Sequence, residues 1–152
     1  MRIQKEFKFC AAHQLTNHDG KCRMIHGHNY RVLVTVEGEP LSDTKHPKHG
    51  MVVDFSNLSF ECKSIEQNWD HRFLITGDEP IVKLLDTLPN AEKSAVWETL
   101  GLQWVGFRTT AENMARSIFY TLSKRFNVVE VTVYETETAC ATYRSQDRDN
   151  EG

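Results

Sequence analysis

β-branched or aromatic side chains recur at every second position between Asn29 and Gly38, and this run constrains the fold more than any other stretch. One parity carries Tyr30, Val32, Val34 and Val36, and the other carries Arg31, Leu33, Thr35 and Glu37. A period of two residues is typical of a β-strand. Ile3–Cys10 shows the same period, with Ile3, Phe7 and Phe9 on one parity and charged residues between them. We therefore expect two strands near the start of the chain, the first with one face buried.

A helical spacing replaces this alternation in the middle of the chain. Asp54 can cap a helix, and the apolar residues that follow it at a helical spacing are Phe55, Leu58, Cys62, Ile65 and Trp69. Thr109 or Thr110 can cap a second, stronger helix. The other elements predicted are short helices at Pro80–Asp86 and Glu92–Leu100, the latter ended by Gly101, and strands at Val128–Thr136 and Cys140–Arg144. Strands at both ends with helices between them predict an α+β domain with an antiparallel sheet.

Composition and charge exclude several classes of protein. The 152 residues suit one domain, which we place at residues 1–144, and the polar tail 145–152 is expected to be disordered. No apolar run approaches the roughly 20 residues of a membrane span, and the charged start "MRIQKEFKF" does not resemble a signal peptide. A formal charge of −3 without a basic block argues against a nucleic-acid partner. We expect a cytoplasmic protein whose four cysteines are thiols.

Three histidines form a candidate metal site. His26 and His28 flank a single glycine, so on an extended chain both imidazoles point to the same side, and Gly27 leaves room for close backbone approach. With His13 as a third ligand they suit a zinc ion whose fourth position is open, as in catalytic sites. The alternative is that all three are loop histidines with ordinary hydrogen bonds. The remaining loop histidines, His18, His46 and His49, are read as ordinary surface residues.

Cys22 stands between Lys21 and Arg23, and nearby cations favour a thiolate. Such a thiolate suits three roles, namely a fourth metal ligand, a nucleophile or a base. The alternative is a surface thiol without a role. Cys10 and Cys62 are read as core residues, because one lies in a predicted strand and the other on the apolar stripe of a predicted helix.

The spacing Cys22-x3-His26-Gly27-His28 resembles the 6-pyruvoyltetrahydropterin synthase / 6-carboxytetrahydropterin synthase family. The other motifs that carry the resemblance, in the family's order, are "FCAAHQL", "GMVVDFSNL", "NWDHRFL", "RTTAENMARSI" and "YETETACATYR". The resemblance covers nearly the whole chain. It implies a tunnelling fold, in which an antiparallel four-stranded sheet carries two main helices on one face. It also implies a homohexamer, a dimer of trimers, with active sites at subunit interfaces.

The resemblance also implies a role for individual residues. His13, His26 and His28 match zinc ligands, Cys22 matches a catalytic base, and Asp70 with His71 matches a pair that works with it in proton transfer. Glu135 matches a carboxylate that anchors the pterin ring, and Thr109, Thr110 and Glu112 match a segment near the pterin.

Some of these residues have simpler explanations. Glu135 shares its parity with Val131 and Val133, and a carboxylate at the end of an apolar strand face is costly unless it is paired. A pterin presents adjacent N–H donors that a carboxylate can accept together. The alternative is that Glu135 is a solvated glutamate at the end of the strand. Thr109-x-x-Glu112 fits a capping box, which needs no ligand. Without the family, Asp70 and His71 would be a surface pair.

The resemblance implies a lyase that acts on 7,8-dihydroneopterin triphosphate. We favour the branch that forms 6-carboxytetrahydropterin, acetaldehyde and triphosphate on the route to 7-deazaguanines such as queuosine. A first alternative is the 6-pyruvoyltetrahydropterin synthase branch, in which triphosphate leaves without the carbon–carbon cut. A second is a pterin-binding module without turnover.

Overall fold

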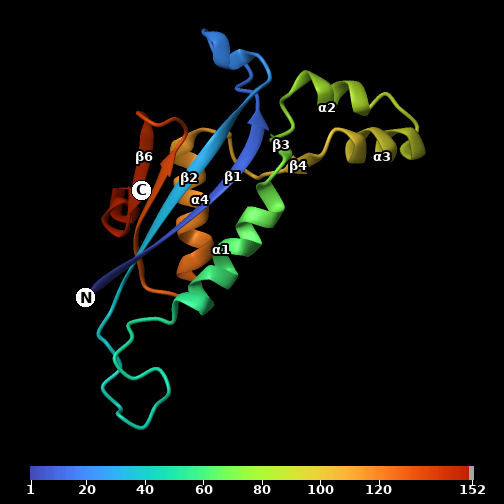
Figure 1. Ribbon diagram of the computed structural model, residues 1–152. Helices are drawn as coiled ribbons and strands as arrows, with labels where there is room; N and C mark the ends of the chain where they lie inside the picture. The colour runs from blue at the N-terminus through green and yellow to red at the C-terminus, as the bar shows by residue number, and fades with distance from the viewer. Residues whose placement is uncertain (151–152) are drawn as a thin grey trace.

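The computed structural model describes residues 1–150, in which a six-stranded sheet carries helices on one face (Figure 1). The strands are β1 (Arg2–His13), β2 (His26–Glu37), β3 (Arg72–Ile75), β4 (Leu102–Trp104), β5 (Val128–Tyr134) and β6 (Cys140–Arg144). Their order across the sheet is β4-β3-β1-β2-β5-β6. β1, β2, β5 and β6 pair antiparallel in that order, whereas β3 pairs with β1, and β4 with β3, in parallel. The α+β class is confirmed, but the expected four-stranded antiparallel sheet is wrong because the sheet is larger and mixed.

The two additional strands, β3 and β4, are short, and this explains why the alternation of apolar and polar residues did not reveal them. β3 has four residues and β4 has three, which is too few to show an alternation. They are held by a small apolar cluster of their own, which contains Phe73, Ile75, Leu85 and Leu102. Their parallel pairing places the segment after the first long helix directly beside β1.

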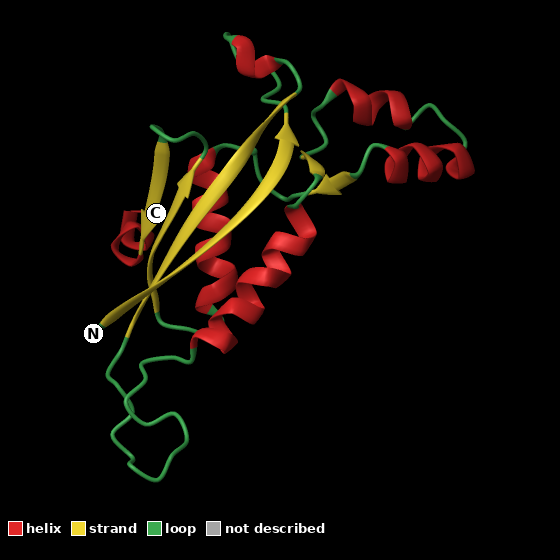
Figure 2. Ribbon diagram, viewed as in Figure 1, coloured by secondary structure: helices red, strands yellow, loops and turns green. Residues whose placement is uncertain are grey.

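Two long helices, α1 (Phe55–Trp69) and α4 (Ala111–Ser123), lie on the same face of the sheet (Figure 1, Figure 2). α1 begins as predicted, because the Asp54 carboxylate accepts a hydrogen bond of 2.8 Å from the Ser56 N–H. Its predicted apolar stripe is buried except for Phe55, which is 52% exposed. The main core lies between these helices and the sheet, and its largest fully buried members include Tyr30, Phe119, Leu58, Leu74 and Met114.

The two shorter helices, α2 (Pro80–Leu85) and α3 (Asn90–Thr99), form a hairpin that projects from the β3–β4 end of the sheet (Figure 2). Gly101 has φ +58° just after α3, a conformation that favours glycine, and this agrees with the predicted stop. None of the described helices is both long enough and apolar enough to cross a membrane.

The C-terminal segment is more ordered than expected. Ser145–Asn150 forms a 3-10 helix, labelled η2, in place of the disorder expected for this part of the tail. The Arg144 N–H donates to the Asp147 carboxylate at 2.7 Å, and the Arg148 guanidinium lies 4.7 Å from the centre of the Phe119 ring. Glu151 and Gly152, the rest of that tail, lie outside the described residues.

Candidate active site

The three histidines lie on strands and not in a loop. β1 and β2 extend to His13 and His26, which face each other as the last pair of the antiparallel ladder, and His28 lies two residues further along β2. A Cβ atom at Gly27 would lie 3.0 Å from the Ala11 carbonyl oxygen, so the close backbone approach expected at this glycine is confirmed. The strand pairing therefore brings the three imidazoles to one end of the sheet.

Their ring nitrogens converge. The Nε2 atoms of His13 and His26 are 3.1 Å apart, and one ligand atom from each of the three histidines lies within 4.8 Å of the others. On the far side of each ring, the Nδ1–H of His13 donates to the Thr109 carbonyl and that of His26 to the Met24 carbonyl, both at 2.7 Å. A carbonyl oxygen can only accept, so both Nδ1 atoms carry the proton and both Nε2 lone pairs are free.

Burial favours the neutral form of two of these imidazoles, those of His13 and His28. His13 is 1% exposed, and burial lowers its pKa to about 4 although the Thr109 carbonyl opposes the shift. Burial also lowers the pKa of His28, against the opposing charge of Glu135. The Nε2 of His28 is buried and forms no hydrogen bond within the described part of the chain. Three converging imidazole nitrogens, of which the buried His28 Nε2 has no partner among the described residues, fit a zinc ion, so His13, His26 and His28 are the residues that would hold it.

Glu135 follows directly after β5 and belongs to this site. Its Oε1 lies 3.6 Å from the Nε2 atoms of both His13 and His28, too far for hydrogen bonds, and its side chain is 30% exposed. It is therefore not the fully solvated strand end considered above. Tyr30 lies between these groups and the core, 1% exposed. Burial raises the pKa of the Tyr30 phenol, and the nearby Glu135 carboxylate and Cys22 sulfur raise it further.

Cys22 and Glu135 line the same pocket, which has a volume of about 470 Å³. Cys22 lies in a short 3-10 helix, η1 (Lys21–Arg23), and its carbonyl accepts a 2.9 Å hydrogen bond from the Leu15 N–H, which ties the segment to the end of β1. Its thiol is not among the described ligand atoms that converge with the histidines. All four cysteines are free thiols, as predicted; Cys62 is buried in the core, but Cys10 is exposed, so its assignment to the core was wrong.

The start of α4 contributes to the same pocket through its N-cap, Thr110, and through Glu112 in its first turn. The cap of α4 is Thr110, whose hydroxyl accepts from the Asn113 N–H at 3.4 Å. The capping box considered for Thr109 and Glu112 is therefore wrong, because the helix begins one residue later than that box requires. Glu112 is exposed and borders the pocket, whereas Thr109 is fully buried and meets the site through its carbonyl.

Asp70 and His71 are joined to each other and to the Cys10 main chain by hydrogen bonds. The Asp70 carboxylate accepts the Cys10 N–H and the His71 Nδ1–H, both at 2.8 Å, and the His71 N–H donates to the Cys10 carbonyl at 2.7 Å. The Cys10 and His71 hydrogen bonds lower the pKa of Asp70. His71 has φ +55°, a strained conformation for a residue other than glycine, and it turns the chain from α1 into β3. The pair is thus more than two adjacent surface side chains.

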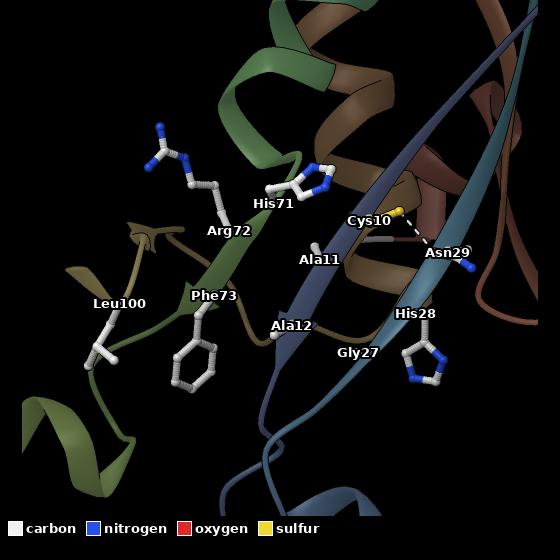
Figure 3. A pocket seen from close by; sticks show the side chains of 10 residues that line it. All are labelled: Cys10, Ala11, Ala12, Gly27, His28, Asn29, His71, Arg72, Phe73 and Leu100. Atoms are coloured by element: carbon white, nitrogen blue, oxygen red, sulfur yellow. Dashed lines mark hydrogen bonds between the residues drawn. The ribbon is translucent and has the colours of Figure 1, made fainter. Parts of the chain in front are cut away.

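His71 of this pair lines a different pocket from Cys22. Figure 3 shows this pocket of about 410 Å³, with His71 and Arg72 on the β3 side of β1 and His28 on the β2 side. The pocket that holds Cys22 does not include His71. Within one chain, the structure therefore groups Cys22, Thr110, Glu112 and Glu135, places Glu135 against the histidines, and leaves Asp70 and His71 apart from Cys22.

Sequence reasoning missed four groups that shape this site. The Thr109 and Met24 carbonyls orient His13 and His26, and main-chain groups of this kind leave no signal in a sequence. The main chain of Cys10 holds Asp70 and His71 across 60 residues of sequence. Tyr30 did carry a signal, because it shares its parity with His26 and His28.

Comparison with known proteins agrees with these observations. A family model described as 6-pyruvoyl tetrahydropterin synthase matches residues 2–146. A 6-carboxy-5,6,7,8-tetrahydropterin synthase from Haemophilus influenzae is 36% identical over 146 residues, which is 94% of this chain and 98% of the relative. A probable 6-carboxy-5,6,7,8-tetrahydropterin synthase from Halobacterium salinarum is 31% identical over 141 residues, covering 90% of this chain and 82% of the relative.

Solved structures show the same likeness. An uncharacterized protein from Wolinella succinogenes has a TM-score of 0.78 at 25% identity, covering 95% of this chain and 98% of the other. The 6-pyruvoyl tetrahydropterin synthase of Caenorhabditis elegans has a TM-score of 0.64 at 25% identity, covering 95% of each chain. Sequence motifs, fold and site thus agree over almost the whole chain, which belongs to the 6-pyruvoyl tetrahydropterin synthase family of lyase-type pterin enzymes.

Proposed function

We propose that the protein is a zinc-dependent 6-carboxy-5,6,7,8-tetrahydropterin synthase. It converts 7,8-dihydroneopterin triphosphate and water to 6-carboxytetrahydropterin, acetaldehyde and triphosphate, on the route to 7-deazaguanines such as queuosine. The observation that carries the proposal is the convergence of three imidazoles beside Glu135, at the border of the pocket that holds Cys22. The names of the relatives from Haemophilus influenzae and Halobacterium salinarum support the carboxy branch.

Each group of residues has a task in this reaction. Glu135 accepts the adjacent N–H donors of the pterin ring, with Thr110 and Glu112 on the border of the same pocket. Cys22, in reach of that pocket, takes a proton from the substrate side chain as a general base. A zinc ion held by the three histidines would supply Lewis acidity to the side-chain oxygens of the substrate.

Asp70 and His71 supply the second proton transfer. Because Asp70 accepts from the Nδ1–H of His71, the Nε2 of that ring is left free to take or give a proton. Their distance from Cys22 within one chain is consistent with a site completed between copies. We therefore propose that the protein acts as a homo-oligomer, a hexamer built as a dimer of trimers, in which His71 of one copy serves the Cys22 pocket of another.

One assay separates the possible functions. The zinc-loaded protein is incubated with 7,8-dihydroneopterin triphosphate, and acetaldehyde, triphosphate and the pterin product are measured. Acetaldehyde in equal amount to triphosphate supports the proposal. Triphosphate with a 6-pyruvoyl product and no acetaldehyde would assign the chain to the activity named for the Caenorhabditis elegans structure. Bound but unchanged pterin would make it a binding module.

A further inference from the structure

Tyr30 combines two features that a core tyrosine rarely has. It is 1% exposed and stacked on Phe9 with ring centres 4.9 Å apart, yet its hydroxyl forms no hydrogen bond of good geometry within the described residues. The Glu135 carboxylate is nevertheless close enough to help raise the pKa of this phenol. A buried hydroxyl without a partner costs free energy that phenylalanine would not. Because phenylalanine would fill this position without that cost, the hydroxyl points to a role for Tyr30 in the site.

The position of that hydroxyl follows from strand register. β2 and β5 pair so that Arg31 faces Tyr134 and Val32 faces Val133. Continuing this antiparallel register by one residue sets Tyr30 opposite Glu135, on the face that also carries Val133. Side chains directly opposite on one face are neighbours. The sheet itself thus brings the phenol and the carboxylate together.

His13 and His28 lie next to both Tyr30 and Glu135. The Tyr30 ring lies 5.6 Å from the His28 ring and 6.2 Å from the His13 ring, both edge to face. Glu135 Oε1 lies 3.6 Å from the Nε2 atoms of the same two histidines. A carboxylate so close to a metal site is drawn toward a bound cation unless another donor holds it. A neutral phenol is a suitable donor, because it can give one hydrogen bond and leaves the other lone pairs of the carboxylate free.

We propose that Tyr30 is a positioning residue, whose buried hydroxyl donates to the Glu135 carboxylate and holds it toward the pocket, ready for the N–H donors of a pterin. The inference rests on the proposed function for the identity of the ligand, but not for the Tyr30–Glu135 hydrogen bond itself. The residue does not touch the reacting atoms; it acts through Glu135.

The test is Tyr30→Phe, which removes the hydroxyl and keeps the stacked ring. Affinity for neopterin, an oxidised pterin without triphosphate, is measured by fluorescence titration, and KM and kcat are measured with the triphosphate substrate. We expect neopterin to bind about 10-fold more weakly, the lower end for a hydrogen bond to a charged group, with KM raised more than kcat is lowered. The melting temperature of the metal-free protein should change little, because the lost hydroxyl has no hydrogen bond of good geometry within the described residues.

Two further variants test whether the loss of neopterin affinity in Tyr30→Phe depends on Glu135. In a Glu135→Gln background, Tyr30→Phe should weaken neopterin binding little further, since the carboxylate that it positions is gone. Tyr143→Phe is the matched control, because Tyr143 is also buried but its hydroxyl lies 3.0 Å from that of Tyr120, away from the histidines. It should lower stability and leave neopterin affinity unchanged.

Crystal structures of the zinc-loaded protein test the contact without a pterin. We expect Glu135 within hydrogen-bond distance of Tyr30 in the wild type and displaced in Tyr30→Phe. Unchanged neopterin affinity in Tyr30→Phe, an equal loss in the Glu135→Gln background, or a wild-type structure without the contact would each overturn the inference. A wild type that shows the contact but neither binds nor converts pterin would support Tyr30 as a positioning residue and refute the proposed function.

Discussion

Replacing Asp70 with asparagine separates the two tasks of this carboxylate. Oδ1 accepts the Cys10 N–H and Oδ2 accepts the His71 Nδ1–H, each at 2.8 Å. An asparagine oxygen can still accept from Cys10, but its NH2 group faces His71 as a donor. The imidazole must then move its proton from Nδ1 to Nε2 to accept that hydrogen bond. Asp70→Asn therefore keeps the main-chain anchor and reverses the tautomer of His71.

The expected losses of turnover and of stability in Asp70→Asn differ greatly in size. If the Nε2 of His71 accepts a proton during the reaction, the wrong tautomer removes general acid–base catalysis, and kcat should fall by about 10²–10⁴. The stability cost should be small, below about 1 kcal/mol, because the His71 side chain is 82% exposed and one of the two hydrogen bonds survives.

Acid stability supplies a second signature of the same change. The folded chain holds the pKa of Asp70 below its ordinary value, chiefly through the Cys10 N–H. The stabilisation from its charge is therefore present above about pH 4, the ordinary pKa of an aspartate, and is lost as the pH falls through the lower folded value. Asp70→Asn should lack this contribution, so its stability should fall less steeply in acid.

The assay is acetaldehyde release from 7,8-dihydroneopterin triphosphate, with zinc content and melting temperature measured on the same samples. Asp54→Asn is a matched control, because Asp54 also accepts a main-chain N–H at 2.8 Å, from Ser56 at the start of α1. Asparagine caps helices about as well as aspartate, so this variant should keep its stability and turnover. Wild-type kcat in a zinc-loaded, folded Asp70→Asn protein would refute a catalytic role for the oriented imidazole.

Four further predictions concern the metal content and single side chains. Cys22→Ala should keep its zinc, because the thiol is not among the convergent ligand atoms, while turnover falls by about 10²–10⁴; loss of zinc would show that the thiol is a ligand. The wild type should bind near one equivalent of zinc by metal analysis and His28→Ala much less, and an active wild type without metal would contradict the zinc site. Burial raises the pKa of Cys62 to about 11, so at pH 8 it should react with iodoacetamide far more slowly than the exposed Cys140. The folded chain keeps a proton that an unfolded cysteine releases above about pH 8.5, so the stability associated with Cys62 should fall as the pH rises toward 11, and Cys62→Ala should lack that slope.

Periodicity predicted the parts of the fold that are long enough to show it. β1, β2, α1 and α4 each span 12 or more residues, and their apolar parity or stripe matches the buried face. The histidine cluster was predictable for the same reason, since parity places His26 and His28 on one face of β2. β3 and β4 were missed because four and three residues cannot show a period.

Contacts made by the main chain across long sequence separations were beyond prediction. The Thr109 carbonyl fixes the tautomer of His13 across 96 residues, and the Cys10 main chain holds Asp70 across 60. Neither contact depends on the side chain of the residue that provides it. Cys10 itself was misread for a simpler reason: it has the opposite parity to Phe7 and Phe9, so it points away from the core that they enter.

The role of Glu135 depends on strand register, which the local sequence pattern does not reveal. Its parity with Val131 and Val133 was visible in the sequence, but parity alone left both a solvated strand end and a ligand-binding carboxylate open. The choice depends on which residue of β2 lies opposite Glu135. Continuing the β2–β5 register by one residue beyond the Arg31–Tyr134 pair makes that residue Tyr30. A shift of one residue in this register would turn the valines out of the core and take the carboxylate away from the histidines. The burial of Val131 and Val133, at 0% exposure, therefore stabilises the same register that holds Glu135 at the site, so core packing and site geometry depend on a single alignment of two strands.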